Sequence, residues 1–200
     1  MNSCTDKSTK NFNKDCITFI NDKEGGEIQR RLKDFTLVAL RSGISTGVSN
    51  KLGNVLLFWI ELKRRLDPKY ETKTLQYVYQ LEHIMPQKWE DNWKDVVYVD
   101  ENGNTLPDNE KSKADRYIKI YSLGNMTLLN GRLNASIGNK DFKTKMEGMG
   151  RKKGVIKYSS LSVTKDDLVE KIYRQNKQWN EQTIIEREKY LGDEIISLWG

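Results

Sequence analysis

Hydrophobic positions recur at helical spacing in two segments before residue 70 and in one long segment near the C-terminus. Apolar residues share one face over residues 27–42 and again over about 51–66, where Asp67-Pro68 ends the pattern. A third pattern begins after residues 164–167 (TKDD), which resemble a capping box, and it carries a candidate break near Asn180. We therefore predict that both flanks of the chain are helical.

The centre of the chain changes from helical spacing to alternation. Residues 74–81 (TLQYVYQL) alternate and are rich in aromatic and β-branched residues, which predicts a strand. Residues 118–129 (IKIYSLGNMTLL) predict a second strand, and a long polar connection over about 87–115 separates the two. A basic helix over 132–148, with a candidate break at Gly138, follows. This order predicts a mostly helical α+β fold.

These changes of pattern divide the chain into four segments. Residues 1–24 are polar and are interpreted as a flexible N-terminal segment, and residues 25–70 as a helical extension that packs on the core. Residues 71–148 form the predicted strand–strand–helix core. Residues 149–200 form a predicted loop and long helix that complete the domain. A chain of 200 residues has room for one such domain with its extension.

Composition and charge narrow the class of protein. Hydrophobic residues make up 36% of the chain, and no apolar run approaches the roughly 18 residues of a membrane span. The N-terminus has no apolar core of a signal peptide, so we expect a cytoplasmic protein without a membrane partner. The net charge of +6 favours a polyanionic partner such as nucleic acid, although many soluble proteins are equally basic.

Cysteine and histidine usage restricts the metals that the chain can bind. Cys4 and Cys16 lack the spacing of a zinc site and are interpreted as free thiols in a reducing compartment. The chain has one histidine, His83, so a Cys/His zinc centre is nearly excluded. Any metal must then be held largely by oxygen atoms, which suits Mg²⁺, Mn²⁺ or Ca²⁺.

Side chains suited to phosphodiester cleavage gather where the first predicted strand ends. His83 follows Glu82, and Pro86 would close the strand because proline cannot continue a sheet ladder. A neutral histidine takes a proton from water well near pH 7, since its ordinary pKa is about 6.5. A divalent cation held by oxygen ligands can neutralise the transition state and stabilise the leaving oxygen.

Two asparagines continue this pattern in the downstream strand and helix. We expect Asn125, in the second strand, to hydrogen-bond His83 and to fix its tautomer. We expect the side-chain oxygen of Asn134, on the following helix, to reach a metal near Glu82. Basic residues cluster beside this helix, and those expected to contact phosphate are Arg132, Lys140 and Lys145.

Each of these residues also has an ordinary structural interpretation. A lone histidine is more often structural than catalytic, and Glu82 could form a surface salt bridge. Asn125 after Gly124 is also typical of a turn, and Asn134 of a helix N-cap. A basic cluster is usually a solvated face.

The motifs and their order resemble a known family of nucleases. Residues 82–87 (EHIMPQ) resemble the first strand of HNH (His-Me finger, ββα-metal) endonucleases. Residues 122–129 (SLGNMTLL), 133–134 (LN) and 139–145 (NKDFKTK) resemble the C-terminal nuclease domain of GmrSD-type modification-dependent restriction enzymes. The resemblance covers roughly residues 50–200.

This resemblance implies a ββα-metal core and a role for each matched residue. It makes His83 the general base, Glu82 and Asn134 ligands of Mg²⁺ or Mn²⁺, and Asn125 the residue that orients the histidine. It also implies a DNA endonuclease of a restriction system that defends against modified foreign DNA. Relatives usually carry an N-terminal nucleotide-hydrolysing domain with an Asp-Gly-Gln-Gln-Arg motif, which this chain lacks. The alternatives are a non-catalytic nucleic-acid-binding module and a helical interaction domain.

Overall fold

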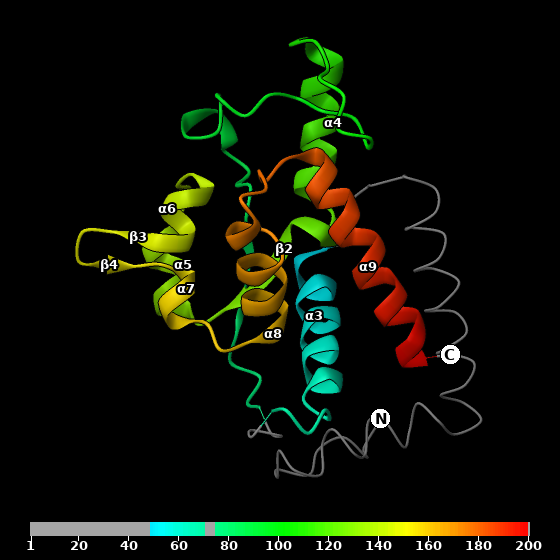
Figure 1. The fold of residues 1–200 in the computed structure, drawn as a ribbon, viewed down its shortest axis with the longest axis vertical. Helices are drawn as coiled ribbons and strands as arrows, with labels where there is room; N and C mark the ends of the chain where they lie inside the picture. Colours follow the sequence, from blue (N-terminus) through cyan, green and yellow to red (C-terminus); the bar gives the residue numbers. More distant parts are fainter. Residues whose placement is uncertain (1–48, 71–74, 200) are drawn as a thin grey trace.

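The computed structural model describes residues 49–70 and 75–199, and within these ranges the chain is mostly helical (Figure 1). The helical elements are α3 (Asn50–Arg64), η1 (Trp89–Asp91), α4 (Glu110–Ile120), η2 (Leu123–Asn125), α5 (Gly131–Ile137), α6 (Phe142–Glu147), α7 (Val155–Tyr158), α8 (Ser162–Thr164), η3 (Lys165–Glu170), η4 (Tyr173–Gln175) and α9 (Glu181–Trp199). The strands form two antiparallel pairs, β1 (Gln80–His83) with β2 (Met126–Leu129) and β3 (Gly148–Met149) with β4 (Lys152–Lys153). The mostly helical α+β class is confirmed in this coarse form.

The central strand pair is shorter than the two predicted strands. Gln80 pairs with Leu129 and His83 with Met126, so the two strands overlap over only four residues each. Residues 75–79 lie outside any strand, and position 74 lies outside the described residues. The alternating pattern therefore predicted a strand that begins too early along the chain. Strand formation depends on the partner strand as well as on local preference, and β2 pairs only with residues 80–83.

The predicted strand over residues 118–129 was wrong in its first part. Its first three residues are the last turn of α4, which begins inside the connection that was predicted to be a loop. Asn109 caps this helix, because its side chain accepts a hydrogen bond from the backbone nitrogen of Ser112 at 2.9 Å. A capped helix that ends at Ile120 thus replaces the strand, and β2 keeps only residues 126–129.

A buried cation organises the long connection between β1 and α4. The guanidinium of Arg116 lies 4.8 Å from the ring centroid of Trp89 and 4.0 Å from that of Tyr98. It also donates hydrogen bonds to the backbone oxygens of Val96 and Val97 at 2.9 and 3.0 Å. The connection is therefore packed against α4 instead of extending into solvent.

The N-terminal helix of the described part confirms the prediction for residues 51–66. α3 begins after Ser49, whose hydroxyl accepts a hydrogen bond from the backbone nitrogen of Leu52 at 3.2 Å. The helix predicted over residues 27–42 and the polar segment 1–24, with both cysteines, lie outside the described residues.

The final helix begins later than the predicted capping box. Thr164 makes no capping hydrogen bond and leads into η3, which has π-helical hydrogen bonding. α9 instead begins after Asn180, whose side-chain oxygen accepts a hydrogen bond from the backbone nitrogen of Thr183 at 3.1 Å. The predicted break near Asn180 is confirmed. Neither α9 nor any other helix of the described ranges has the length and apolar character needed to cross a membrane.

Helices cover both sides of the central strand pair. α3 and α9 contact each other on one side of β2, whereas α5, α6 and α7 lie on the other side (Figure 1). α9 approaches η2 so closely that a Cβ atom added to Gly124 would lie 2.1 Å from the backbone oxygen of Ile184. Arg187 of α9 donates hydrogen bonds to the backbone oxygens of Gly124 and Met126 at 2.7 and 2.6 Å. α9 therefore holds the turn that leads into β2.

Candidate active site

The pairing of β1 with β2 brings the histidine and the first asparagine of the motif to one end of the sheet. His83 is the last residue of β1 and pairs with Met126, the first residue of β2. One residue further on, the backbone nitrogen of Ile84 donates a hydrogen bond to the backbone oxygen of Asn125 at 2.9 Å. The turn formed by η2 therefore lies directly beside the segment that follows His83.

The side chain of Asn125 is fully buried and uses all of its hydrogen-bonding capacity. Its oxygen accepts hydrogen bonds from the backbone nitrogen of Met85 at 2.8 Å and from the indole nitrogen of Trp179 at 3.0 Å. Its nitrogen donates to the backbone oxygens of Met85 and Ile120 at 2.8 and 2.9 Å. The amide thus hydrogen-bonds the backbone of Met85, two residues after His83. The sequence led us to expect a hydrogen bond to the imidazole of His83, which the amide does not make.

The imidazole of His83 is partly buried and keeps one nitrogen without a partner. Its Nε2 atom is buried and makes no hydrogen bond with any described residue. The ring of Tyr121 meets the imidazole edge-on, with a distance of 5.8 Å between the ring centroids. Burial and, to a smaller extent, the positive charge of Lys145 lower the pKa of His83 to about 4. The histidine is therefore neutral near pH 7, and one of its ring nitrogens, Nε2, has no partner. A buried polar atom without a partner is typical of catalytic positions and of water sites.

Glu82 forms an ion pair with a lysine that comes from α6. The ammonium group of Lys145 lies 2.5 Å from the carboxylate of Glu82 and 2.8 Å from the backbone oxygen of His83. Burial raises the pKa of Glu82 and lowers that of Lys145, because it disfavours the charged form of each group. The salt-bridge interpretation of Glu82 is thus realised, although the pair is inside the protein and not on its surface.

The basic residues expected to contact phosphate differ in their exposure. The side chain of Lys145 is fully buried, so the structure does not present its ammonium group to solvent. Arg132 on α5 is exposed, and Lys140 between α5 and α6 is partly exposed. The predicted break at Gly138 is confirmed between these two helices, and the φ of +46° at Gly138 favours glycine.

Asn134 projects from α5 toward β1 but bonds a residue that the sequence did not single out. Its nitrogen donates a hydrogen bond to the side-chain oxygen of Gln80 at 3.2 Å. Because alternate residues of a strand share one face, Gln80 and Glu82 lie on the same face of β1. The N-cap of α5 is Asn130, whose side chain accepts from the backbone nitrogen of Leu133 at 2.8 Å. Asn134 is therefore free of the capping role.

The oxygen donors on this face suit a metal held by few protein ligands. Among the described residues, no group of three or more histidine, cysteine, aspartate or glutamate side chains gathers. Glu82 could supply a carboxylate, which Lys145 already holds, and Asn134 could supply an amide oxygen from α5. Mg²⁺ usually binds one or two carboxylates and completes its shell with water and substrate phosphates. The donor set fits that pattern.

Several members of the site were missed because their contacts join distant parts of the chain. Lys145 bonds Glu82 from α6, Trp179 bonds Asn125 from the segment before α9, and Tyr121 meets His83 from the end of α4. Gln80, the partner of Asn134, was also missed, but the sequence could have indicated it. It precedes Glu82 by two positions in the same predicted strand, so its side chain lies on the same face.

Comparisons with known proteins give one match. Residues 30–194 match the family described as GmrSD restriction endonucleases, C-terminal domain. No curated protein and no solved structure matches the chain significantly. The matched range contains every residue of the candidate site.

Proposed function

This chain belongs to the family of GmrSD restriction endonuclease C-terminal domains, and on that basis we propose that it hydrolyses phosphodiester bonds of DNA at the site around His83. The proposal assigns β1, β2 and α5 to a ββα-metal motif of the HNH type. The observation that carries it is the imidazole of His83, which is neutral near pH 7 and has one ring nitrogen, Nε2, without a partner. The elements follow one another in the order strand, strand, helix.

In the proposed reaction His83 acts as the general base. Its neutral imidazole takes a proton from a water molecule while the water oxygen forms a bond to phosphorus. The bond between phosphorus and the 3′ oxygen breaks, and the leaving oxygen receives a proton from solvent. The pKa of about 4 keeps the imidazole unprotonated near pH 7, at the cost of some basicity.

Glu82 of β1 and Asn134 of α5 would hold a divalent cation, Mg²⁺ or Mn²⁺, and Asn134 reaches β1 through its hydrogen bond to Gln80. When bound, such a cation neutralises charge on the phosphoryl oxygens and stabilises the leaving 3′ oxygen. The ammonium group of Lys145 balances the carboxylate of Glu82 in the absence of the cation. It also holds the backbone oxygen of His83, so it positions both residues.

Asn125 is proposed as a positioning residue that acts through the backbone. It binds both the nitrogen and the oxygen of Met85, so it fixes the path of the chain after His83. Phosphate contacts are proposed for Arg132 and Lys140, whose side chains reach solvent. The fully buried Lys145 is assigned to Glu82 instead.

Cleavage of supercoiled plasmid in Mg²⁺ or Mn²⁺ tests the proposal. The parent chain should nick unmodified DNA or DNA with modified bases, and His83→Ala should lower the rate by about 10²–10⁴-fold. Glu90→Ala, an exposed change on η1, is the control that should leave the rate unchanged. A folded His83→Ala protein that cuts as fast as the parent would exclude His83 as the base.

A non-catalytic DNA-binding module is the second candidate, and the ion pair of Glu82 with Lys145 favours it. A metal at Glu82 must share its carboxylate with an ammonium group, which weakens the site. This candidate predicts DNA binding without cleavage in either metal.

For the leading candidate, the nuclease, we propose a role in a defence system that acts on modified foreign DNA. There it would work together with an N-terminal NTPase-type domain or subunit.

A further inference from the structure

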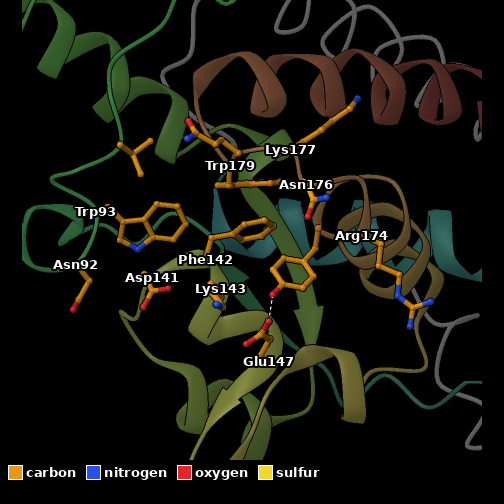
Figure 2. A pocket seen from close by; sticks show the side chains of 13 residues that line it. Asn92, Trp93, Asp141, Phe142, Lys143, Glu147, Arg174, Asn176, Lys177 and Trp179 are labelled. Atoms are coloured by element: carbon orange, nitrogen blue, oxygen red, sulfur yellow. Dashed lines mark hydrogen bonds between the residues drawn. The ribbon is translucent and has the colours of Figure 1, made fainter.

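A pocket lined by aromatic rings lies beside the candidate active site. It has a volume of about 610 Å³ and lies between the segment after η1, the start of α6 and the segment that precedes α9 (Figure 2). Four rings from these three segments line it, namely Trp93, Phe142, Tyr173 and Trp179. Residues far apart in the sequence therefore build one aromatic surface.

The four rings form a fixed floor and a partly open layer above it. Trp93 and Trp179 are buried, and each indole nitrogen donates a hydrogen bond at 3.0 Å, to the backbone oxygen of Lys140 and to the side chain of Asn125 respectively. Phe142 stacks on Trp179 with a centroid distance of 5.4 Å and an angle of 28°. This arrangement leaves Phe142 partly open to solvent on a rigid base.

Tyr173 completes the open layer of the pocket. Its ring meets Phe142 edge-on at a centroid distance of 5.8 Å, and its hydroxyl donates a hydrogen bond to Glu147 (Figure 2). Glu147 is thereby occupied by the tyrosine. The other carboxylate of the pocket, Asp141, accepts hydrogen bonds from the backbone nitrogen and the hydroxyl of Thr144 at 2.9 and 2.5 Å. Both carboxylates therefore have hydrogen-bonding partners in the protein, and they keep their negative charge.

The rim of the pocket carries cations and amides that are open to solvent. Lys143 and Lys177 lie on either side of Phe142, both are exposed, and neither has an ion-pair partner among the described residues (Figure 2). Asn176, which adopts a left-handed φ of 56°, and Gln178 add exposed amides without side-chain partners in the same part of the chain. The pocket thus offers flat apolar surface, positive charge and hydrogen-bonding groups together.

Two connections join this pocket to the candidate active site. Trp179 of the floor binds Asn125, which in turn binds the backbone of Met85 after His83. α6 carries Phe142 at the pocket and Lys145 at Glu82, about 5 Å apart along the helix axis. The pocket and the candidate site are therefore built on shared elements, η2 and α6.

We propose that this pocket binds one unstacked base of the DNA, with Lys143 holding the phosphate on one side of that base and Lys177 the phosphate on the other. The inference rests on the proposed function and adds to it a second contact that selects DNA with an unpaired or extruded base. Aromatic side chains bind any base through its π-face, and cations beside them bind the backbone. An unpaired base comes either from a single strand or from a duplex that extrudes it.

Binding of labelled oligonucleotides by the full chain, in EDTA so that no cleavage occurs, tests the proposal. Three probes are compared: a single strand, a perfect duplex and a duplex with one mismatch. The pocket predicts tighter binding of the single strand or of the mismatched duplex than of the perfect duplex. Tightest binding of the single strand would show that the bound base comes from single-stranded DNA. Tightest binding of the mismatched duplex would show that the base is extruded from a duplex.

Matched variants separate ring contacts from charge contacts. Phe142→Leu keeps the side chain apolar and removes the ring, so it should weaken binding of the preferred probe about tenfold. Tyr158→Leu removes an exposed ring outside the pocket and should bind like the parent. Lys143→Gln with Lys177→Gln should weaken all probes, whereas Lys189→Gln, exposed on α9, should weaken none.

Crosslinking of the parent chain gives a second measurement that does not depend on folding of a variant. A 5-iodouracil base in the preferred probe should crosslink to Phe142 or Tyr173. Equal binding of all three probes, or crosslinks only to residues outside the pocket, would overturn the proposal. Because no cleavage is measured, this result is independent of whether His83→Ala abolishes nicking.

Discussion

The ammonium group of Lys145 lies 2.5 Å from the carboxylate of Glu82, and this contact joins α6 to the end of β1 that carries His83. The lysine side chain is fully buried and the glutamate side chain is 15% exposed, so water screens the pair only weakly. A positive charge is thereby held inside the candidate site. The following predictions test this contact and the others that shape the site.

Loss of the buried ammonium group should destabilise the fold. Lys145→Met keeps the length of the side chain but leaves Glu82 without its partner, which should lower the free energy of unfolding by about 3 kcal/mol. Lys143→Met, two positions earlier and exposed, should change it by less than about 0.5 kcal/mol. Urea unfolding of both variants checks this, and equal stability of the two would show that the ion pair contributes nothing.

Asn125→Ala should be among the most damaging single changes to the site. It leaves four buried polar groups without their shared partner, and each unsatisfied group costs about 1–3 kcal/mol in isolation. We expect a loss of at least about 3 kcal/mol in the free energy of unfolding. Asn139→Ala, an exposed asparagine without a side-chain bond to a described residue, is the control and should unfold like the parent. A mild effect at Asn125 would contradict its role as the anchor of η2.

Gly124→Ala should displace α9 from η2. The added methyl group would lie 2.1 Å from the backbone oxygen of Ile184, which cannot move without the helix. Overpacking of this kind costs typically about 1–3 kcal/mol, and we expect the upper end of that range. In Gly131→Ala the new methyl group would meet only the side chain of Gln80, at 3.0 Å, so its melting temperature should stay near that of the parent. Similar melting temperatures for both variants would argue against close packing at Gly124.

The single histidine of the chain allows its protonation to be followed directly. In the metal-free protein the proton NMR signal of His83 should titrate with a midpoint near pH 4, below the ordinary value of about 6.5. Between these values the unfolded chain binds one more proton than the folded chain, so stability falls as the pH drops from about 6.5 to 4. The contribution is fully present above pH 6.5. A midpoint at or above 6.5 would contradict the burial of the imidazole.

Local pattern predicted some elements well and others wrongly. α3 and the breaks at Gly138 and Asn180 were predictable, because helical spacing, glycine and asparagine act within a few residues. The first part of the strand predicted over residues 118–129 was wrong. Its branched residues suited a strand locally, but the cap at Asn109 and the burial of Arg116 placed them in α4.

The sequence by itself determined the family and the mostly helical α+β class, because motif order and spacing are properties of the chain alone. It also predicted four site residues, Glu82, His83, Asn125 and Asn134. Only the tertiary structure decided which groups these residues meet. It paired Glu82 with Lys145 and directed Asn125 to Met85 and Trp179. Such contacts join residues up to 63 positions apart, and which side chains meet there depends on how α6 and α9 pack on the strands.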